Sequence, residues 1–268
     1  MSARLRHYGC GSTRQDIGML FRGGAGGVRG ARDFVSGVFL HDDGRGRRIL
    51  FDTGYTTDRW ETGWHGAAYR RILPPLVEPE DDVALRLRED GIDPATITHV
   101  VLSHLHPDHI GGVRRFPQAR FVLTEDQRAS LAAPRLRETI LPGLLPDWFP
   151  GADPIVLDRT DFGTATFGGQ ELHVADPFGD GGFLVVDLPG HARGHVGALV
   201  EGRILLAGDA AWGADLLDAA PRMRALPLAL QHDGPAYQET AALLRTVRDA
   251  GIRVICSHDP VGARELLG

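Results

Sequence analysis

Residues 98–112 read THVVLSHLHPDHIGG, and a run of β-branched and apolar residues here leads directly into a cluster of polar ones. The run at 98–102 is typical of a buried strand. The cluster at 104–109 holds three histidines and one aspartate within six positions. Such groups at the end of a buried strand need partners for their polar atoms, because burying them unpaired costs free energy. A bound metal ion supplies those partners, so we interpret the cluster as metal ligands and not as a histidine-rich turn exposed to solvent.

The spacing within the cluster predicts two pairs of ligands that point at two neighbouring metal positions. In an extended segment alternate residues share a face, so His104 and His106 can point at one position while Leu105 turns away. Asp108 and His109 follow a proline, where the chain is expected to turn into a helix and to aim a second pair of ligands at a neighbouring position. These ligands are too few for two ions, so about three more are expected from elsewhere in the chain.

Three other strand-like segments end in histidine or aspartate. The segment PGHARGH (189–195) follows the apolar run FLVVDL, GDAAW (208–212) follows RILLA, and SHD (257–259) follows RVIC. Loops at the ends of strands are where α/β folds assemble their sites. These segments add four candidates, which are His191, His195, Asp209 and His258.

Strand-like and helix-like segments alternate along the rest of the chain. Residues 34–54 contain two strand-like runs separated by a turn, which favours a hairpin. Residues 78–91 combine an early proline, acidic residues in the first turn and apolar residues at helical spacing, and they predict a helix. Further strands are expected at 97–104, 119–124, 182–190, 196–202, 203–209 and 253–258, with helices at 125–133 and 235–251. This alternation predicts a layered α/β fold.

Two segments stand outside this pattern, although we expect a single domain across residues 1–268. Residues 1–33 precede the first expected strand and are interpreted as an N-terminal extension or loop. Residues 134–154 carry five prolines together with leucine, tryptophan and phenylalanine, which is too interrupted for a long helix. This segment is either a surface loop packed on the core or a lid over a pocket, since long ordered loops often have a function.

The composition narrows the classes of partner. The 268-residue chain is 43% hydrophobic and 24% charged, as in ordinary globular proteins. Two cysteines are too few for a disulfide framework or a cysteine-rich zinc site. The net charge of −6 comes without the broad basic face that binds nucleic acid, and there is no apolar run of membrane-spanning length or apolar signal segment at the start. We therefore expect a cytoplasmic protein that acts on a small molecule, without nucleic-acid or membrane partners, in an oligomeric state that the sequence leaves open.

These motifs together resemble the metallo-β-lactamase superfamily, and within it most of all the N-acyl-homoserine lactonase and glyoxalase II type of enzyme. The resemblance runs from FDTG (51–54) through SHLHPDH, PGHARGH and GDAAW to SHD, and it covers the chain from about residue 34 to the C-terminus. It implies a four-layer αβ/βα sandwich, an α/β fold in which two mixed β-sheets are flanked by helices, with the metals at one edge of the sheets. It also implies a metal-dependent hydrolase of the lactonase, esterase or thioesterase kind.

The resemblance also implies a ligand set for two divalent metal ions. Seven residues match its positions: His104, His106 and His195 for one ion, Asp108, His109 and His258 for the other, and Asp209 as a bridge. Zinc is the expected metal because imidazole and carboxylate suit it, although iron and manganese occupy similar sets. In PGHARGH the second histidine matches the ligand of the family, so His191 is interpreted as structural or as a support for the site.

The implied reaction is hydrolysis of an ester, lactone or thioester by a hydroxide that bridges the two metals. Asp108, beside that hydroxide, is the candidate to carry the proton to the leaving oxygen. Asp52 in FDTG is interpreted either as a support that orients a ligand imidazole or as a turn-forming residue. Lactonases carry a tyrosine three residues beyond the bridging aspartate, where this sequence has Trp212, and Tyr55 is a candidate to replace that tyrosine.

Three other functions remain open from the sequence. An iron-dependent sulfur dioxygenase of the same fold uses a single metal and a smaller ligand set. A phosphodiesterase needs phosphate-binding residues and commonly a basic face, which are not found. A metabolite-binding protein with slow turnover is the alternative outside the enzymes, and steady hydrolysis of a simple ester or lactone would separate it from the main prediction.

Overall fold

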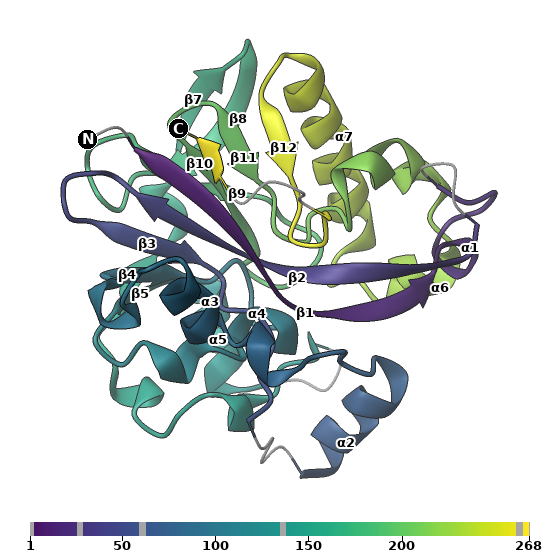
Figure 1. Cartoon of the computed structure of the whole chain (residues 1–268). Helices are drawn as coiled ribbons and strands as arrows, with labels where there is room; N and C mark the ends of the chain where they lie inside the picture. The colour runs from purple at the N-terminus through teal and green to yellow at the C-terminus, as the bar shows by residue number, and fades with distance from the viewer. Residues whose placement is uncertain (1–2, 26–28, 59–62, 135–137, 261–264, 268) are drawn as a thin grey trace.

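Two β-sheets face each other at the centre of the molecule (Figure 1). The computed structural model describes residues 3–25, 29–58, 63–134, 138–260 and 265–267. The first sheet has the order β13-β1-β2-β3-β4-β5-β6, formed by Glu265–Leu267, Arg4–Asp16, Ala31–Asp42, Arg48–Phe51, His99–Val101, Arg120–Thr124 and Ile155–Leu157. The second sheet has the order β12-β11-β10-β9-β8-β7, formed by Arg253–Ile255, Ile204–Leu206, Val196–Val200, Phe183–Asp187, Gln170–Ala175 and Gly163–Phe167. Both sheets are mixed, since β3 to β6 and the pair β11 and β12 run parallel while the other pairs are antiparallel.

Helices cover the outer faces of the sheets. The α-helices are α1 Ile17–Leu20, α2 Gly63–Ile72, α3 Val83–Glu89, α4 Pro107–Ile110, α5 Glu125–Ala132, α6 Ala225–Ala229 and α7 Gly234–Asp249. In Figure 1, α3 and α5 lie on the outer side of the first sheet and α7 lies beside the second. The four-layer sandwich expected from the sequence is confirmed. Among the described residues, no helix is both long and apolar enough to cross a membrane.

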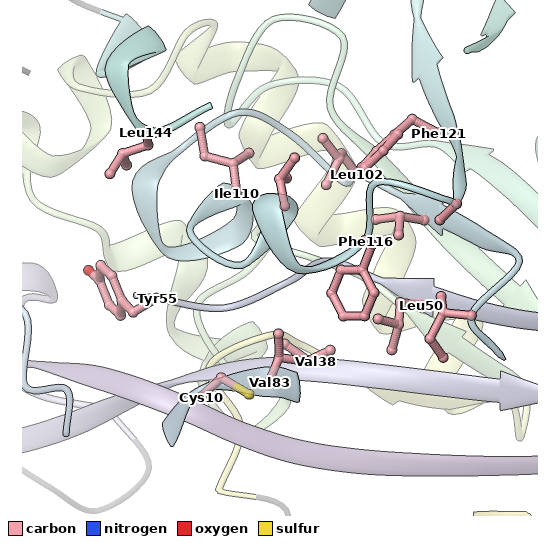
Figure 2. Close-up of a cluster of buried hydrophobic side chains, with 14 of the residues drawn as sticks. Cys10, Val38, Leu50, Tyr55, Val83, Leu102, Ile110, Phe116, Phe121 and Leu144 are labelled. Atoms are coloured by element: carbon pink, nitrogen blue, oxygen red, sulfur yellow. The ribbon is translucent and has the colours of Figure 1, made fainter. Parts of the chain in front are cut away.

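The core follows from the alternation of side chains along the strands. On β3, Leu50 belongs to the cluster beneath the helices of the first sheet, whereas Ile49 and Phe51 belong to the cluster between the two sheets. Val100 and Val101 of β4 divide in the same way. Figure 2 shows the helix-facing cluster. Because both faces of these parallel strands are buried, their sequences are apolar throughout, as 98–102 suggested.

The N-terminal segment differs from the sequence-based expectation. Residues 1–33 were expected to be an extension or loop, but β1 spans Arg4–Asp16 and pairs antiparallel with β2 from Arg4↔Asp42 to Asp16↔Ala31. The alternation in β1 is interrupted by a register shift between Gly9 and Ser12, and its exposed positions carry arginine and other polar residues. This broken pattern hides the strand in the sequence, because its pairing with β2 and not its own periodicity determines it.

The parallel strands determine where the functional residues gather. β3 and β4 are in register at Phe51↔Val101, so the chain leaves both strands at the same edge. β11 and β12 are in register at Leu206↔Ile255 in the second sheet. Asp52, the loop after β4, Asp209 and His258 all follow these strand ends. The fold therefore brings four distant loops to one edge of the sandwich, as the sequence predicted.

The later part of the proline-rich segment 134–154 packs on the hydrophobic core. Residues 135–137 lie outside the described residues. Leu141, Leu144 and Phe149 are buried in the helix-facing cluster, and the Phe149 ring lies 5.0 Å from that of Phe121 on β5. The later part of the segment therefore packs on the core, and a lid function for the whole segment stays a prediction.

His7 on β1 makes the stability of the fold depend on pH. Its ring is 6% exposed, lies 5.0 Å from the ring of Phe39, and has no hydrogen-bond partner for Nε2 among the described residues. Burial lowers the pKa of His7 from 6.5 to about 4. The unfolded chain therefore protonates His7 more readily than the folded chain does. The contribution of neutral His7 to the free energy of unfolding is fully present above pH 6.5 and is lost as the pH falls toward 4.

We therefore expect His7→Gln to flatten the pH dependence of unfolding. Between pH 7 and pH 4, the wild type should lose up to about 3 kcal/mol more free energy of unfolding than the variant. Urea denaturation of the two proteins at each pH measures the difference, and the effects of all other groups largely cancel in the comparison. Parallel pH profiles for the two proteins would contradict the assignment to His7.

Candidate metal centre

The first ligand group consists of His104, His106 and His191. One ring nitrogen from each of them lies within 4.8 Å of the others. The closest pair is Nε2 of His191 and Nδ1 of His106, at 3.1 Å. Two of the three histidines come from the loop after β4, and the third comes from the loop after β9. The structure thus joins the two halves of the chain at this point.

The second group lies directly beside the first and consists of Asp108, His109, Asp209 and His258. Its members are close: Asp108 Oδ2 lies 3.5 Å from His109 Nε2, and Asp209 Oδ2 lies 3.0 Å from His258 Nε2. The rings of His104 and His109 are 4.0 Å apart between centroids, which places the two groups side by side. The sequence-based prediction of two neighbouring ligand positions is in accord with this geometry.

Asp209 lies between the two groups. Its Oδ1 is 3.5 Å from His109 Nε2, and its Oδ2 is 3.5 Å from Nε2 of His191 as well as close to His258. Oδ1 thus faces the second group and Oδ2 faces both groups, and a carboxylate that reaches both is suited to bridge two cations. This position agrees with the bridging role that the family resemblance implied.

His195 is the correction that the structure makes to the predicted ligand set. Its Nδ1 donates to the carbonyl of Leu188 at 2.9 Å, and its Nε2 accepts the backbone N–H of Asp209 at 3.0 Å. With both ring nitrogens engaged, His195 has no lone pair left for a cation. His191, interpreted from the sequence as structural or as a support for the site, lies beside His104 and His106 in the place predicted for His195.

The ring nitrogens on the far side of the ligand histidines are held by hydrogen bonds. Nδ1 of His191 is 2.8 Å from Gln231 Oε1, Nδ1 of His258 is 2.7 Å from the carbonyl of Val35, and Nδ1 of His104 is 3.0 Å from Ser103 Oγ. Each bond keeps a proton on Nδ1 and leaves the Nε2 lone pair directed into the centre. Such outer partners fix the tautomer and orientation of metal-binding imidazoles.

Asp52 supports His109 in the same manner. Its Oδ2 lies 2.8 Å from His109 Nδ1 and accepts the hydroxyl of Ser103, while its Oδ1 accepts the Ser103 backbone N–H at 2.7 Å. Asp52 is fully buried and has φ of 64°, a left-handed conformation that costs free energy for a residue other than glycine. Of the two interpretations made from the sequence, the structure favours the support of an imidazole over a simple turn.

Two glycines allow helix α4 to pack against the loop that carries Asp52. A Cβ on Gly111 would lie 2.6 Å from the Gly54 carbonyl oxygen, and one on Gly112 would lie 2.5 Å from that of Thr53. The Thr53 hydroxyl and backbone N–H both donate to the His109 carbonyl, at 2.8 and 2.9 Å. The close approach of the two backbones therefore fixes the position of His109.

Unpaired buried atoms test whether these residues fit a metal. Nε2 of His104, Nε2 of His109 and Oδ1 of Asp209 are buried and have no hydrogen-bond partner among the described residues. Buried polar atoms without partners are rare and costly. All three face the junction of the two ligand groups, and nitrogen and carboxylate oxygen are ligands that divalent transition metals accept. The residues present therefore fit a metal centre.

Burial keeps the imidazoles of the first group neutral. It lowers the pKa of His104 well below the usual value and lowers the pKa of His106 and of His191 to about 4. A neutral imidazole retains the lone pair that a metal requires. At neutral pH these three side chains can bind a cation without first releasing a proton.

Carboxylates have the opposite effect on the second group. Burial would lower the pKa of His109, but the charge of Asp108, followed by those of two further aspartates, raises it well above the usual value. For His258, Asp209 outweighs the effect of burial and raises the pKa to about 9. Without an ion, protons on the two histidines thus balance the carboxylates, and binding of a cation here releases protons.

Two of the predicted substrate residues, Tyr55 and Trp212, pack against other aromatic side chains. Tyr55 is 1% exposed within the helix-facing cluster (Figure 2), and its hydroxyl lies 2.8 Å from that of Tyr69. Trp212 is half-buried and packs with Phe21 and Tyr237, each ring at 6.4 Å. Neither Tyr55 nor Trp212 lines the cavity that opens onto the metal ligands.

That cavity has a volume of about 310 Å³ and is bounded on one side by His106 and His191. Leu105, Ile140 and Leu230 contribute apolar surface to it. Polar side chains such as Ser130 and Gln231 line the rest of it. A cavity that combines apolar surface with convergent polar groups is the usual form of a small-molecule site. The arrangement is that of a metal centre at the wall of a substrate-sized cavity.

The family model described as the Metallo-beta-lactamase superfamily matches residues 30–258. The chain belongs to this superfamily. It is 30% identical over 231 residues to a probable metallo-hydrolase of Mycobacterium bovis, covering 82% of this chain and 72% of the relative. It is 31% identical over 195 residues to the N-acyl homoserine lactonase AttM of Azorhizobium caulinodans, covering 69% and 67%.

A solved structure shares the superfamily fold. It is that of AidC, described as a dizinc quorum-quenching lactonase, and it matches with a TM-score of 0.64 at 16% identity, covering 98% of this chain and 89% of the other. The family match and the named relatives make this protein a metal-dependent hydrolase of the metallo-β-lactamase superfamily. The recognition made from the motifs is confirmed.

Nothing in the sequence indicates that two glutamines, Gln127 and Gln231, hold the ligand loops in place. Gln127 Nε2 donates to the carbonyls of Ser103 and Gly194, at 2.9 and 3.0 Å, and so ties the two ligand loops together. Gln231 orients His191 from a segment with no recognisable motif. A single Gln in a helical pattern gives no sign of such a role, whereas the choice between His191 and His195 had a usable signal. His195 directly precedes the buried strand β10, so burial in the core could have been expected for it.

Proposed function

We propose that the protein is a dinuclear metal hydrolase, with zinc as its metal, that cleaves the ester, lactone or thioester bond of a small molecule. His104, His106 and His191 would hold one ion, and Asp108, His109 and His258 the other, with Asp209 shared. The observation that carries the proposal is the position of Asp209 between two complete ligand groups. A second complete group distinguishes this site from the single-metal centre of a dioxygenase.

Two divalent ions would supply the charge that acidifies a water molecule and polarises a carbonyl group. The chain itself contributes preorganised side chains, because outer hydrogen bonds hold His109, His191 and His258 in place. Such preorganised charge needs no rearrangement when the reaction occurs.

Asp108 is the candidate to move the proton. Its side chain is 12% exposed, so it is the most accessible of the four members of the second group. Burial would raise the pKa of Asp108, but His109 and then His258 outweigh it and lower that pKa. A carboxylate that stays ionised can accept the proton released during attack and give it to the leaving oxygen.

The bond that is hydrolysed joins an acyl carbonyl group to the oxygen of an ester or lactone or to the sulfur of a thioester. Relatives at 30–31% identity, including AttM, are named N-acyl homoserine lactonases, and this supports transfer of an acyl group to water. Trp212 replaces the tyrosine of the lactonases and packs away from the cavity. We therefore propose the broader class of esters, lactones and thioesters instead of acyl-homoserine lactones alone.

Metal analysis combined with a substrate panel tests the proposal. Protein purified without chelator should contain about two transition-metal ions per chain and should turn over at least one member of a panel of lactones, thioesters and aryl esters. Chelation should abolish that turnover, and added zinc should restore it. Absence of stoichiometric metal, or steady turnover by the metal-free protein, would overturn the dinuclear mechanism.

A further inference from the structure

Two polar groups that line the cavity have no role in the metal centre. Glu138 is 9% exposed, and both of its carboxylate oxygens are buried without a hydrogen-bond partner among the described residues. Ser130 on α5 is 1% exposed, and its hydroxyl is also buried and unpartnered. The cavity that reaches His106 and His191 thus also contains an unpaired acid and an unpaired hydroxyl.

A buried carboxylate without a partner is costly. Taking an ion out of water is strongly unfavourable unless opposite charge or hydrogen-bond donors replace the lost solvation. The cavity offers little compensation of its own. Arg193 lines it, but the guanidinium of Arg193 is bound to Asp126 through two contacts of 3.1 and 3.0 Å. His232, the other basic side chain at the wall that is not a ligand, is exposed to solvent.

A bound ligand can supply the missing partner. A neutral donor such as an amide N–H would satisfy one carboxylate oxygen and leave the charge. An ammonium group has three donors and a positive charge, so it can neutralise Glu138 and donate a further bond to the Ser130 oxygen. The apolar side chains of Leu105, Ile140 and Leu230 line the same cavity and suit a hydrocarbon spacer.

We propose that Glu138 is the specificity residue of this hydrolase and that it selects substrates carrying a protonated amine at a distance from the carbonyl that is cleaved. This inference rests on the proposed function, because the carbonyl is assigned to the metal centre beside His106 and His191. The substrate class is therefore a cationic ester, lactone or thioester, in which an apolar chain separates the amine from the reacting group.

Matched pairs of substrates test the proposal. One series consists of aryl esters of ω-amino acids of increasing chain length, and the other consists of aryl esters of alkanoic acids of equal length. For wild-type protein, kcat/KM should favour the amino member by about tenfold or more at one chain length, because a site built for a polar group discriminates strongly. In Glu138→Gln this ratio should fall to about one.

Glu239→Gln is the matched control. Glu239 is exposed on α7 and does not line the cavity, so its loss changes the net charge equally without touching the site. The control should keep the wild-type ratio. A wild-type ratio near one at every chain length, or a ratio that survives in Glu138→Gln, would overturn the role of Glu138.

Calorimetry separates this proposal from the function on which it rests. Binding of ω-aminoalkanoates to the metal-loaded protein should weaken in Glu138→Gln and not in Glu239→Gln. If neither ester series is hydrolysed but binding depends on Glu138, the hydrolase proposal fails and the cation site stands. If the esters are hydrolysed without any effect of Glu138 on the ratio or on binding, the hydrolase stands and the cation site fails.

Discussion

Replacing His191 with alanine should remove metal from the protein and lower kcat/KM by about 10³-fold or more, since about 4 kcal/mol of transition-state stabilisation is at stake. Nε2 of His191 lies 3.1 Å from Nδ1 of His106 and 3.5 Å from Asp209 Oδ2, so its loss opens the first ligand group on the side of the cavity. Mass spectrometry of metals on the purified variant and initial rates with the best substrate of the panel measure the two effects.

His195→Ala is the informative comparison, because His195 is only four positions away and is also buried. Its loss removes an acceptor from the Asp209 backbone N–H at 3.0 Å but no ligand. We expect metal to be retained and kcat/KM to fall by about tenfold to a hundredfold, as for residues that orient a ligand. The reverse pattern, with metal lost in His195→Ala and kept in His191→Ala, would restore the ligand set implied by the motif resemblance.

The fold was predictable because its signals are local. The strand at 98–102 and the helix around residues 83–89 carry their periodicity and end signals in a few consecutive residues. The ligand-bearing turns after β4, β11 and β12 could be placed at one edge because parallel strands end together. The structure brings five candidates from those turns together with Asp209, while their binding of metal stays a prediction.

The remaining features depend on contacts between distant segments. Whether His191 or His195 faces the ions is decided by the Leu188 carbonyl and the Asp209 N–H, and both contacts exist only after β9 and β10 have paired. β1 was missed because its pairing with β2 overrides a weak pattern. The carboxylate of Glu138 had no motif around it, and its importance appears only from its burial and its lack of a partner.

Asp209→Ala should have the other large effect, and it should act on both ions at once. The Asp209 carboxylate lies within 3.5 Å of His191, His109 and His258, so no other described residue stands equally between the two groups. We expect metal content to fall to about one ion per chain or less and kcat/KM to fall by about 10³-fold or more. The same metal analysis and initial rates measure both quantities.

Asp218→Ala is the control for this change, because Asp218 is 69% exposed in its side chain and pairs with Arg248 on the surface. It should retain both metal and activity.

The protonation of the second ligand group offers a separate readout for Asp209→Ala. Asp209 is the main contributor that raises the pKa of His258 to about 9 against the effect of burial, so the variant without metal should show that histidine titrating at a lower pH by NMR. Full metal content and full activity in Asp209→Ala would show that the two ligand groups work without a shared carboxylate, and the dinuclear assignment would then fail.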